Sequence, residues 1–245
     1  MRRGATALLL LGALAAGCGA GGNSGGSSSS APPSGAAGRE PRAISRDPAL
    51  VAALGDSITA GSPLWDPVPA FRERITAPTG MAPDERSQWG YWFERADPRR
   101  RLVRNCGVSG ERTDEIAVRL ADCAAGAGAL VIQGGINDIA QGRDVADAAG
   151  DLEAMVRAGR AGGRTVALVE VLPWNNGYPA AAPRIDELND RIRALGKRER
   201  VPVLRWYAAL EDPAARGRMR PDLTIDGDHP SIAGYRRLAG LVMLP

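Results

Sequence analysis

The sequence of 245 residues contains one histidine, three cysteines and only 4% aromatic residues. A single histidine without a cysteine-histidine cluster makes a poor transition-metal site, so we expect no metal and no other cofactor. The formal net charge is +3. A chain that begins at Cys18 lacks two of the 31 basic residues, which leaves 29 against 28 acidic residues, or +1. The pI near 9.0 therefore gives little support for nucleic-acid binding, which requires a concentrated basic face.

The N-terminal stretch MRRGATALLLLGALAAGC (1–18) is too short to span a membrane stably. Its basic start, apolar centre and small residues are typical of a secretory signal peptide, which we expect over residues 1–17. The ending Ala-Ala-Gly-Cys resembles a lipoprotein signal, which implies lipid attachment to Cys18; the alternative is an ordinary cleaved signal peptide with an incidental cysteine. We therefore predict an exported protein that contacts the cell membrane only through a lipid on Cys18, facing outside, or a secreted one if Cys18 is not lipidated.

Residues 19–38 are mostly Gly, Ser, Ala and Pro, a composition that cannot bury enough apolar area to fold. We expect a flexible tether over 18–44 and one domain, a monomer, over 45–245. A formal Gly-x-Ser-x-Gly match at Gly22–Gly26 lies in this tether, whereas the nucleophile turn of an α/β-hydrolase lies between a strand and a helix. In the domain we predict a disulfide between Cys106 and Cys123; the alternative is two buried free thiols.

Short apolar runs alternate with longer amphipathic segments along the domain. Near-continuous apolar runs bounded by glycine or polar residues are typical of strands buried on both faces. Apolar residues recur at helical spacing in Asp144–Arg160 and Pro183–Lys197. This alternation predicts an α/β domain with a doubly wound parallel sheet, in which ligand sites lie beyond the carboxyl ends of the strands. The predicted strands are Ala49–Leu54, Arg101–Asn105, Ala129–Gln133, Thr165–Val171 and Pro202–Arg205.

The motif Gly55-Asp56-Ser57 directly follows the first predicted strand. Both aspartate and serine are good helix caps, so this motif alone has a purely structural explanation. The alternative is that Ser57 is a nucleophile presented at the end of the strand. The choice between the two depends on what the other strand ends carry.

The only histidine, His229, lies three residues after Asp226 and immediately after Asp228. On an irregular segment, a carboxylate at the first spacing can reach one ring nitrogen and leave the other free to accept a proton from a serine. We expect Asp226 to fill this role, because the side chain of Asp228 should point away from that of its neighbour.

Glycine-containing loops follow the second and third predicted strands, at Val108-Ser109-Gly110 and at Gly134–Asp138. Glycine lets a backbone N–H approach a substrate closely, and the amide of Asn137 is a neutral donor. Together with the N–H of Ser57, these groups could form an oxyanion hole. The alternative is that both loops are ordinary turns.

These four blocks, in this order from Gly55 to Pro230, resemble the GDSL or SGNH hydrolases: GDS, then Gly110, then Gly-x-Asn-Asp, then Asp-x-x-His-Pro. The resemblance implies a flavodoxin-like three-layer α/β/α fold with about five strands, and hydrolysis of carboxylic esters. It implies a catalytic triad of Ser57, His229 and Asp226. It also implies an oxyanion hole formed by Ser57, Gly110 and Asn137, although Gly107 is a second glycine in its block.

Aromatic residues in two loops are candidates for lining the substrate site: Trp65 and Phe71 in the long segment after the first strand, and Trp174 and Tyr178 after the fourth. The alternative is local packing of the loops. Such a cleft suits a small ester, a lipid or an acylated sugar, and the sequence does not choose among them. Two further hypotheses are a polysaccharide O-deacetylase on the same fold and a non-catalytic solute- or glycan-binding lipoprotein.

Overall fold

The computed structural model of the protein describes residue 47 and residues 49–244. The predicted signal peptide, Cys18 and the tether therefore lie outside the described residues. Within the described part of the chain, no helix is both long enough and apolar enough to cross a membrane.

A five-stranded sheet forms the centre of the domain, with strand order β2-β1-β3-β4-β5 and all neighbours parallel. This order is that of flavodoxin-like folds, which have their topological switch point between β1 and β3. The prediction of a doubly wound parallel sheet of five strands is confirmed. The strands are β1 (Leu50–Gly55), β2 (Arg101–Gly107), β3 (Ala129–Ile132), β4 (Thr165–Val169) and β5 (Val203–Leu204).

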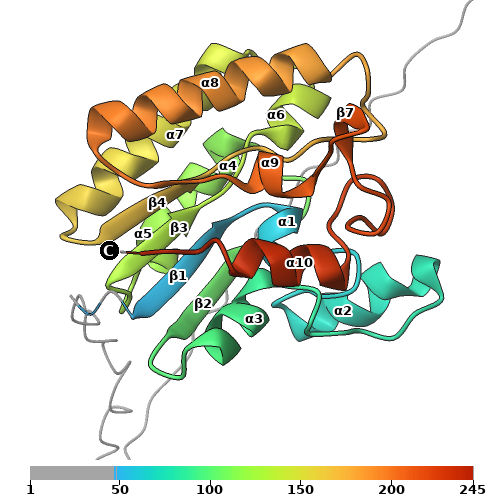
Figure 1. Ribbon diagram of the computed structural model, residues 1–245. Coiled ribbons are helices and arrows are strands. Elements are labelled where there is room, and N and C mark those ends of the chain that lie inside the picture. The colour runs from blue at the N-terminus through green and yellow to red at the C-terminus, as the bar shows by residue number, and fades with distance from the viewer. Residues whose placement is uncertain (1–46, 48, 245) are drawn as a thin grey trace, which may run out of the picture. The chain divides into compact units, whose positions relative to one another are not determined.

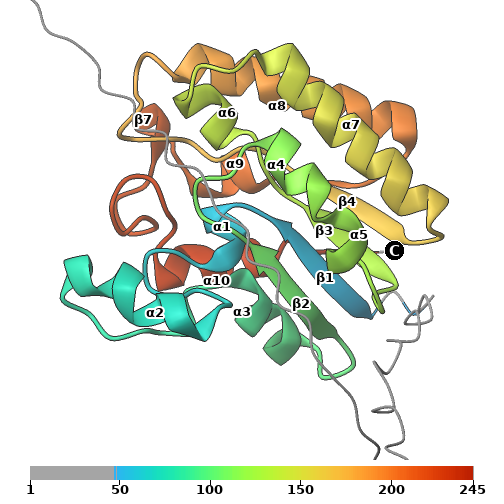
Figure 2. The same ribbon diagram turned by 180° about the vertical axis from the view of Figure 1, so that it is seen from behind.

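Helices cover both faces of the sheet and complete three layers (Figures 1 and 2). One face packs against α4 (Thr113–Val118), α5 (Leu120–Cys123), α7 (Val145–Ala161) and α8 (Ala182–Glu199). The other packs against α3 (Trp89–Ala96), α9 (Trp206–Leu210) and α10 (Ile232–Ala239). Because both faces are buried, the strands show near-continuous apolar runs rather than alternation.

The two long helices follow their predicted apolar stripes. In α7 the buried residues include Leu152 and Met155, and Asp144 caps the helix by accepting from the N–H of Ala146. In α8, Leu188 and Ile192 are buried against the same side of the sheet. Burial of one stripe against the sheet, rather than intrinsic helix propensity, supplies most of the stability of such helices.

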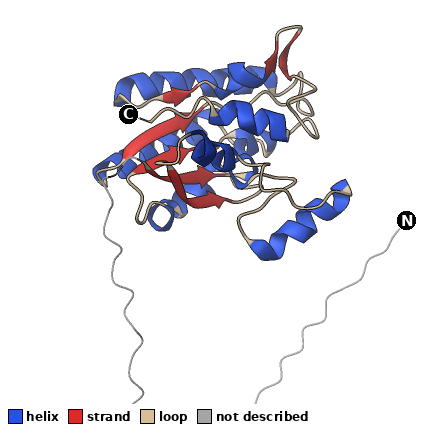
Figure 3. Ribbon diagram, turned by 60° about the horizontal axis from the view of Figure 1, so that its bottom comes forward, coloured by secondary structure: helices blue, strands red, loops and turns tan. Residues whose placement is uncertain are grey.

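Several short elements depart from the regular alternation. The segment between β1 and α3 contains α1 (Ser57–Ala60), α2 (Pro69–Thr76) and the 3₁₀ helix η1 (Ala77–Thr79). A small hairpin of β6 (Glu211–Asp212) and β7 (Ala215–Met219) projects from the layers (Figure 3). The remaining helix, α6 (Ile136–Ala140), follows β3.

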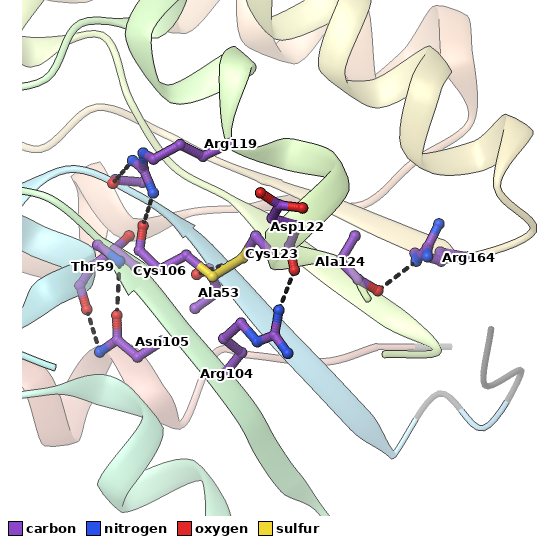
Figure 4. The surroundings of a disulfide bond; sticks show 12 residues. Ala53, Thr59, Arg104, Asn105, Cys106, Arg119, Asp122, Cys123, Ala124 and Arg164 are labelled. Atoms are coloured by element: carbon purple, nitrogen blue, oxygen red, sulfur yellow. Dashed lines mark hydrogen bonds between the residues drawn. A yellow bond between two sulfur atoms is a disulfide. The ribbon is translucent and has the colours of Figure 1, made fainter. Parts of the chain in front are cut away.

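A disulfide joins Cys106 near the end of β2 to Cys123 at the end of α5, with the Cα atoms 6.0 Å apart (Figure 4). It therefore attaches the carboxyl end of an edge strand to the helical layer beside it. That end of β2 leads directly into the loop containing Gly110.

Candidate active site

The turn after β1 separates the roles of Asp56 and Ser57. Asp56 is the N-cap of α1 and accepts from the N–H of Ile58 at 2.9 Å. Ser57 is the first residue of the helix and is 9% exposed. The capping function that the sequence left open between these two residues is therefore performed by Asp56, and the hydroxyl of Ser57 is free for another contact.

The hydroxyl of Ser57 lies 3.0 Å from Nε2 of His229, a residue 172 positions later in the chain. Nδ1 of the same ring lies 2.8 Å from Oδ2 of Asp226. Asp228 does not contact the ring through a hydrogen bond; it accepts from the indole N–H of Trp174 at 2.5 Å. The structure therefore places Ser57, His229 and Asp226 in a hydrogen-bonded chain. With the proton of Nδ1 directed at Asp226, Nε2 is the acceptor for the serine hydroxyl.

Asp226 also shapes the loop that holds the histidine. Its Oδ1 accepts from the backbone N–H groups of Asp228 at 2.9 Å and His229 at 2.7 Å. Partial burial raises the pKa of this carboxyl, but the hydrogen bond and charge of His229, together with the two N–H groups, outweigh burial and bring the pKa below its ordinary value. Asp226 therefore remains ionised and can stabilise a positively charged imidazole.

Beside the turn after β1, a buried polar side chain connects β1 to β3. Gln133 donates through Nε2 to Oδ2 of Asp56 at 2.9 Å, and its Oε1 accepts from the hydroxyl of Thr59 at 2.8 Å. Asp56 is fully buried, and burial raises the pKa of its carboxyl to about 6 against the opposing hydrogen bonds from Ile58 and Gln133. In the sequence, Gln133 is only the last residue of a predicted strand, and a polar residue ending an apolar run was the available signal.

The two glycines after β2 have different surroundings. Gly107 packs against α1 so closely that a Cβ would lie 2.0 Å from the nitrogen of Ala60, and its N–H donates to Oδ1 of Asn105. Gly110 has a φ of +85° and open space where a Cβ would be. Gly107 is therefore a packing glycine, and Gly110 is the better candidate for a substrate donor.

Asn137 lies in α6, after β3, next to the loop that contains Gly110. Its Nδ2 donates to the carbonyl of Glu111 at 2.9 Å. An amide nitrogen carries two N–H groups, so a second donor remains after this bond is made. Asp138, its neighbour, is buried and accepts from the backbone and hydroxyl of Thr113, which makes it an anchor between α6 and α4.

The guanidinium of Arg119 connects the ends of β1 and β2. It donates to the carbonyl of Cys106 at 2.5 Å (Figure 4). It also donates to the carbonyl of Gly55 at 3.1 Å and to the carboxylate of Glu111 through Nε at 2.9 Å. Gly55 precedes the turn that carries Ser57, and Glu111 follows Gly110 and accepts from Asn137. No local sequence pattern indicated this residue, because its three partners lie far from it along the chain or across loops.

The four aromatic candidates have different surroundings. Trp174 contacts the histidine loop through Asp228, and Tyr178 lies under the guanidinium of Arg218 and is 37% exposed. Trp65 lies under the guanidinium of Arg72 and lines a cavity shared with α3 and β2. Phe71 lines a different cavity, beside the loop after β2.

The described residues contain no group of three or more His, Cys, Asp or Glu side chains that could hold a metal ion. The arrangement instead combines a hydroxyl, an imidazole and a carboxylate with neutral donors on adjacent loops. Such a set can activate a nucleophile and stabilise a developing negative charge without a cofactor.

Comparison with solved structures finds the same fold at low sequence identity. A GDSL-like lipase from Bacteroides thetaiotaomicron aligns with a TM-score of 0.61 and 22% identity over 81% of this chain and 87% of that one. A member of the lipolytic protein G-D-S-L family from Veillonella parvula gives 0.60 and 19%, over 78% and 94%. A variant of an acetyl xylan esterase from Geobacillus stearothermophilus gives 0.56 and 18%, over 78% and 91%.

No curated protein sequence matches the chain. The family model described as GDSL-like lipase/acylhydrolase matches residues 53–237, which include all four blocks of the site and most of the chain. The chain therefore belongs to the GDSL-like lipase/acylhydrolase family.

Proposed function

We propose that this protein is a serine hydrolase that cleaves carboxylic esters through Ser57, His229 and Asp226. The observation that carries the proposal is the hydrogen-bonded chain from Ser57 Oγ to His229 Nε2 at 3.0 Å and from His229 Nδ1 to Asp226 at 2.8 Å. This geometry is that of an activated serine nucleophile, in which the carboxylate orients the ring and stabilises its protonated form.

The reaction proceeds in two steps. Ser57 Oγ attacks the ester carbonyl carbon while His229 accepts the hydroxyl proton, and the tetrahedral intermediate then expels the alcohol, which takes that proton from His229. A water molecule loses a proton to His229 and attacks the acyl-enzyme, and the acid leaves as Ser57 regains its proton.

The developing oxyanion needs donors on the side of the carbonyl away from the histidine. The N–H of Ser57, the N–H of Gly110 and the free amide hydrogen of Asn137 are the proposed donors. Their support is the position of each after a neighbouring strand, the open space at Gly110, and the tether of Asn137 to Glu111. Loss of one such donor typically lowers kcat by about 10²–10³.

The second candidate function is removal of O-acetyl groups from a polysaccharide, favoured by the structural similarity to the acetyl xylan esterase. A non-catalytic binding protein is the weakest alternative, because nothing in ligand binding requires a serine, a histidine and an aspartate to form this chain. Release of acetate from an acetylated glycan, compared with release of fatty acid from a lysophospholipid, separates the first two.

The test of the proposed function is hydrolysis of a short-chain ester by the folded protein. We expect Ser57→Ala and His229→Ala to lower kcat by about 10⁴-fold or more. Asp226→Asn should also lose most activity, whereas the matched control Asp228→Asn should retain it, because Asp228 contacts Trp174 rather than the ring. Unchanged hydrolysis in either of the first two variants would contradict the assignment.

We further propose that the protein is an exported monomer that a lipid on Cys18 anchors to the membrane, and that it binds no nucleic acid. The support is the signal-like N-terminus together with the disulfide, since disulfides persist in oxidising compartments. Mass spectrometry of the protein isolated from its native membrane tests the anchor. A mature chain that retains residues 1–17, or an unmodified Cys18, would contradict it.

A further inference from the structure

An apolar cavity of about 230 Å³ lies between α2 and the loop that follows β2. Its walls are mainly aliphatic and aromatic, and its backbone side is the stretch that leads to Gly110. Its lining residues include Val68, Phe71, Ile75, Gly107, Val108 and Ser109.

This cavity adjoins the turn that carries Ser57 through two contacts. The N–H of Val108 donates to the carbonyl of Gly55 at 3.1 Å, two residues before Ser57. The hydroxyls of Ser109 and Ser62 lie 2.9 Å apart, which ties the loop to the end of α1. The cavity wall is therefore packed against the turn that carries the serine and is continuous in sequence with Gly110.

Exposed apolar side chains are concentrated here. Among the described residues, eight large hydrophobic side chains are exposed, and three of them line this cavity: Val68 at 43%, Phe71 at 41% and Val108 at 38%. Single exposed apolar residues are ordinary on a protein surface, but a group that surrounds a cavity marks a binding site.

The position of the leaving oxygen bears on which part of the ester the cavity binds. The leaving oxygen must lie near Nε2 of His229 to receive its proton, so the alcohol lies toward the loop of residues 224–230. Figures 1 and 2 show that loop, which precedes α10, and α2 at different heights on the same edge of the sheet. The acyl substituent lies on another side of the carbonyl carbon from the leaving oxygen, and the apolar cavity beside the loop after β2 is the neighbouring site that suits it.

We propose that this cavity binds the acyl chain, and that the natural substrates are esters of straight-chain acids of about six carbons. The inference rests on the proposed function and adds the substrate class. An apolar cavity of about 150 Å³ holds a molecule the size of benzene, so the observed volume has room for a chain of about six carbons.

Two charged residues limit the length of the chain. The carboxylate of Asp66 is 5% exposed and accepts from the N–H of Val68 at 2.7 Å, and the guanidinium of Arg74 lies 4.6 Å from the ring of Phe71. Both line the cavity. Because charged groups do not favour contact with methylenes, additional carbons beyond the apolar walls should add no affinity.

The test measures kcat/KM for p-nitrophenyl acetate, butyrate, hexanoate and decanoate with the purified protein. Each buried methylene should raise kcat/KM about three- to fourfold up to hexanoate, with no further rise to decanoate. Ile75→Trp, which fills the cavity, should lower the hexanoate-to-acetate ratio about tenfold or more. Phe71→Ala, at an exposed position, should lower the same ratio less. The matched control Met243→Trp adds an indole at a site that is 71% exposed and should keep the wild-type ratio.

A second series keeps the acetyl group and lengthens the alcohol from methyl to hexyl. The proposal expects Ile75→Trp to leave the dependence on alcohol length unchanged. The acyl assignment is overturned if kcat/KM does not depend on acyl-chain length in the wild type, or if this dependence is the same in Ile75→Trp. In either case, Ser57-dependent hydrolysis of the acetate ester still supports the proposed function. A shift confined to the alcohol series overturns it too. Hydrolysis of no ester at all would instead overturn the proposed function itself.

Discussion

Asp56 is a buried carboxyl directly beside the proposed nucleophile. One oxygen accepts from the N–H of Ile58 and the other from the amide of Gln133, so the side chain fixes the start of α1 and joins it to β3. A cap formed by the preceding residue leaves the hydroxyl of Ser57 available to His229. At the residue scale, the turn that carries Ser57 therefore depends on a fully buried carboxyl.

Burial of Asp56 predicts a specific dependence of stability on pH. The pKa is about 6 in the folded protein and near 3.8 in an ordinary environment, so between these values the folded state keeps a proton that the unfolded chain has lost. The stabilising contribution is therefore present below pH 4 and is lost as the pH rises through 6, by up to about 3 kcal/mol.

Asp56→Asn removes this titration, because the amide does not ionise. Urea unfolding of the wild type and the variant at pH 4 and pH 7 measures the contribution of this titration to stability. The free energy of unfolding of the wild type minus that of the variant should fall as the pH rises, because only the wild type carries the Asp56 carboxyl. Other groups, such as Asp226, titrate in both proteins and cancel in this difference. A difference that stays constant across this range contradicts the prediction.

At the scale of elements, Arg119 and the disulfide hold the carboxyl ends of β1 and β2 in place. The guanidinium donates to the carbonyl oxygens of Gly55, at the end of β1, and Cys106, near the end of β2. It also donates to the carboxylate of Glu111, which follows Gly110. The disulfide closes a separation of 17 residues, which is worth about 3 kcal/mol through the unfolded chain. Both connections hold the loops after β1 and β2 in place.

We expect Arg119→Gln to lower kcat about 10- to 100-fold with a smaller effect on KM, because a displacement of the oxyanion donors affects the transition state more than binding. Kinetics with a short-chain ester measure this, and the melting temperature reports the structural effect separately. Arg191→Gln is the matched control, because Arg191 forms an exposed pair with Glu187 on α8. An unchanged kcat in a folded Arg119→Gln protein would refute the positioning role.

At the scale of the whole molecule, the four sequence blocks meet at one edge of the sheet because parallel strands present their carboxyl ends together. Ser57 follows β1 and Asn137 follows β3, on the two sides of the switch point. The alternation of apolar runs with amphipathic stripes is a local signal, so it predicted the strands and the two long helices within a few residues. The flavodoxin-like three-layer arrangement was implied by the family resemblance rather than by these local patterns.

Features that depend on contacts between distant segments were not predictable in the same way. The difference between Gly107 and Gly110 appears only in the packing of Gly107 against α1. The bonds of Gln133 and Arg119 join residues on separate elements. The helix α2 has only one buried residue, Thr76, so its pattern gave no amphipathic signal. The aromatic candidates likewise divide among separate surroundings.

Covalent labelling with a fluorophosphonate tests the central claim, that Ser57 is the nucleophile, most directly. Mass spectrometry of the labelled peptides should find the modification on Ser57 in the folded wild type. It should find none in Ser57→Ala, and much slower labelling in His229→Ala, because the imidazole activates the hydroxyl. Absence of labelling in the folded wild type, or modification of Ser62 or Ser109 instead, would contradict the account.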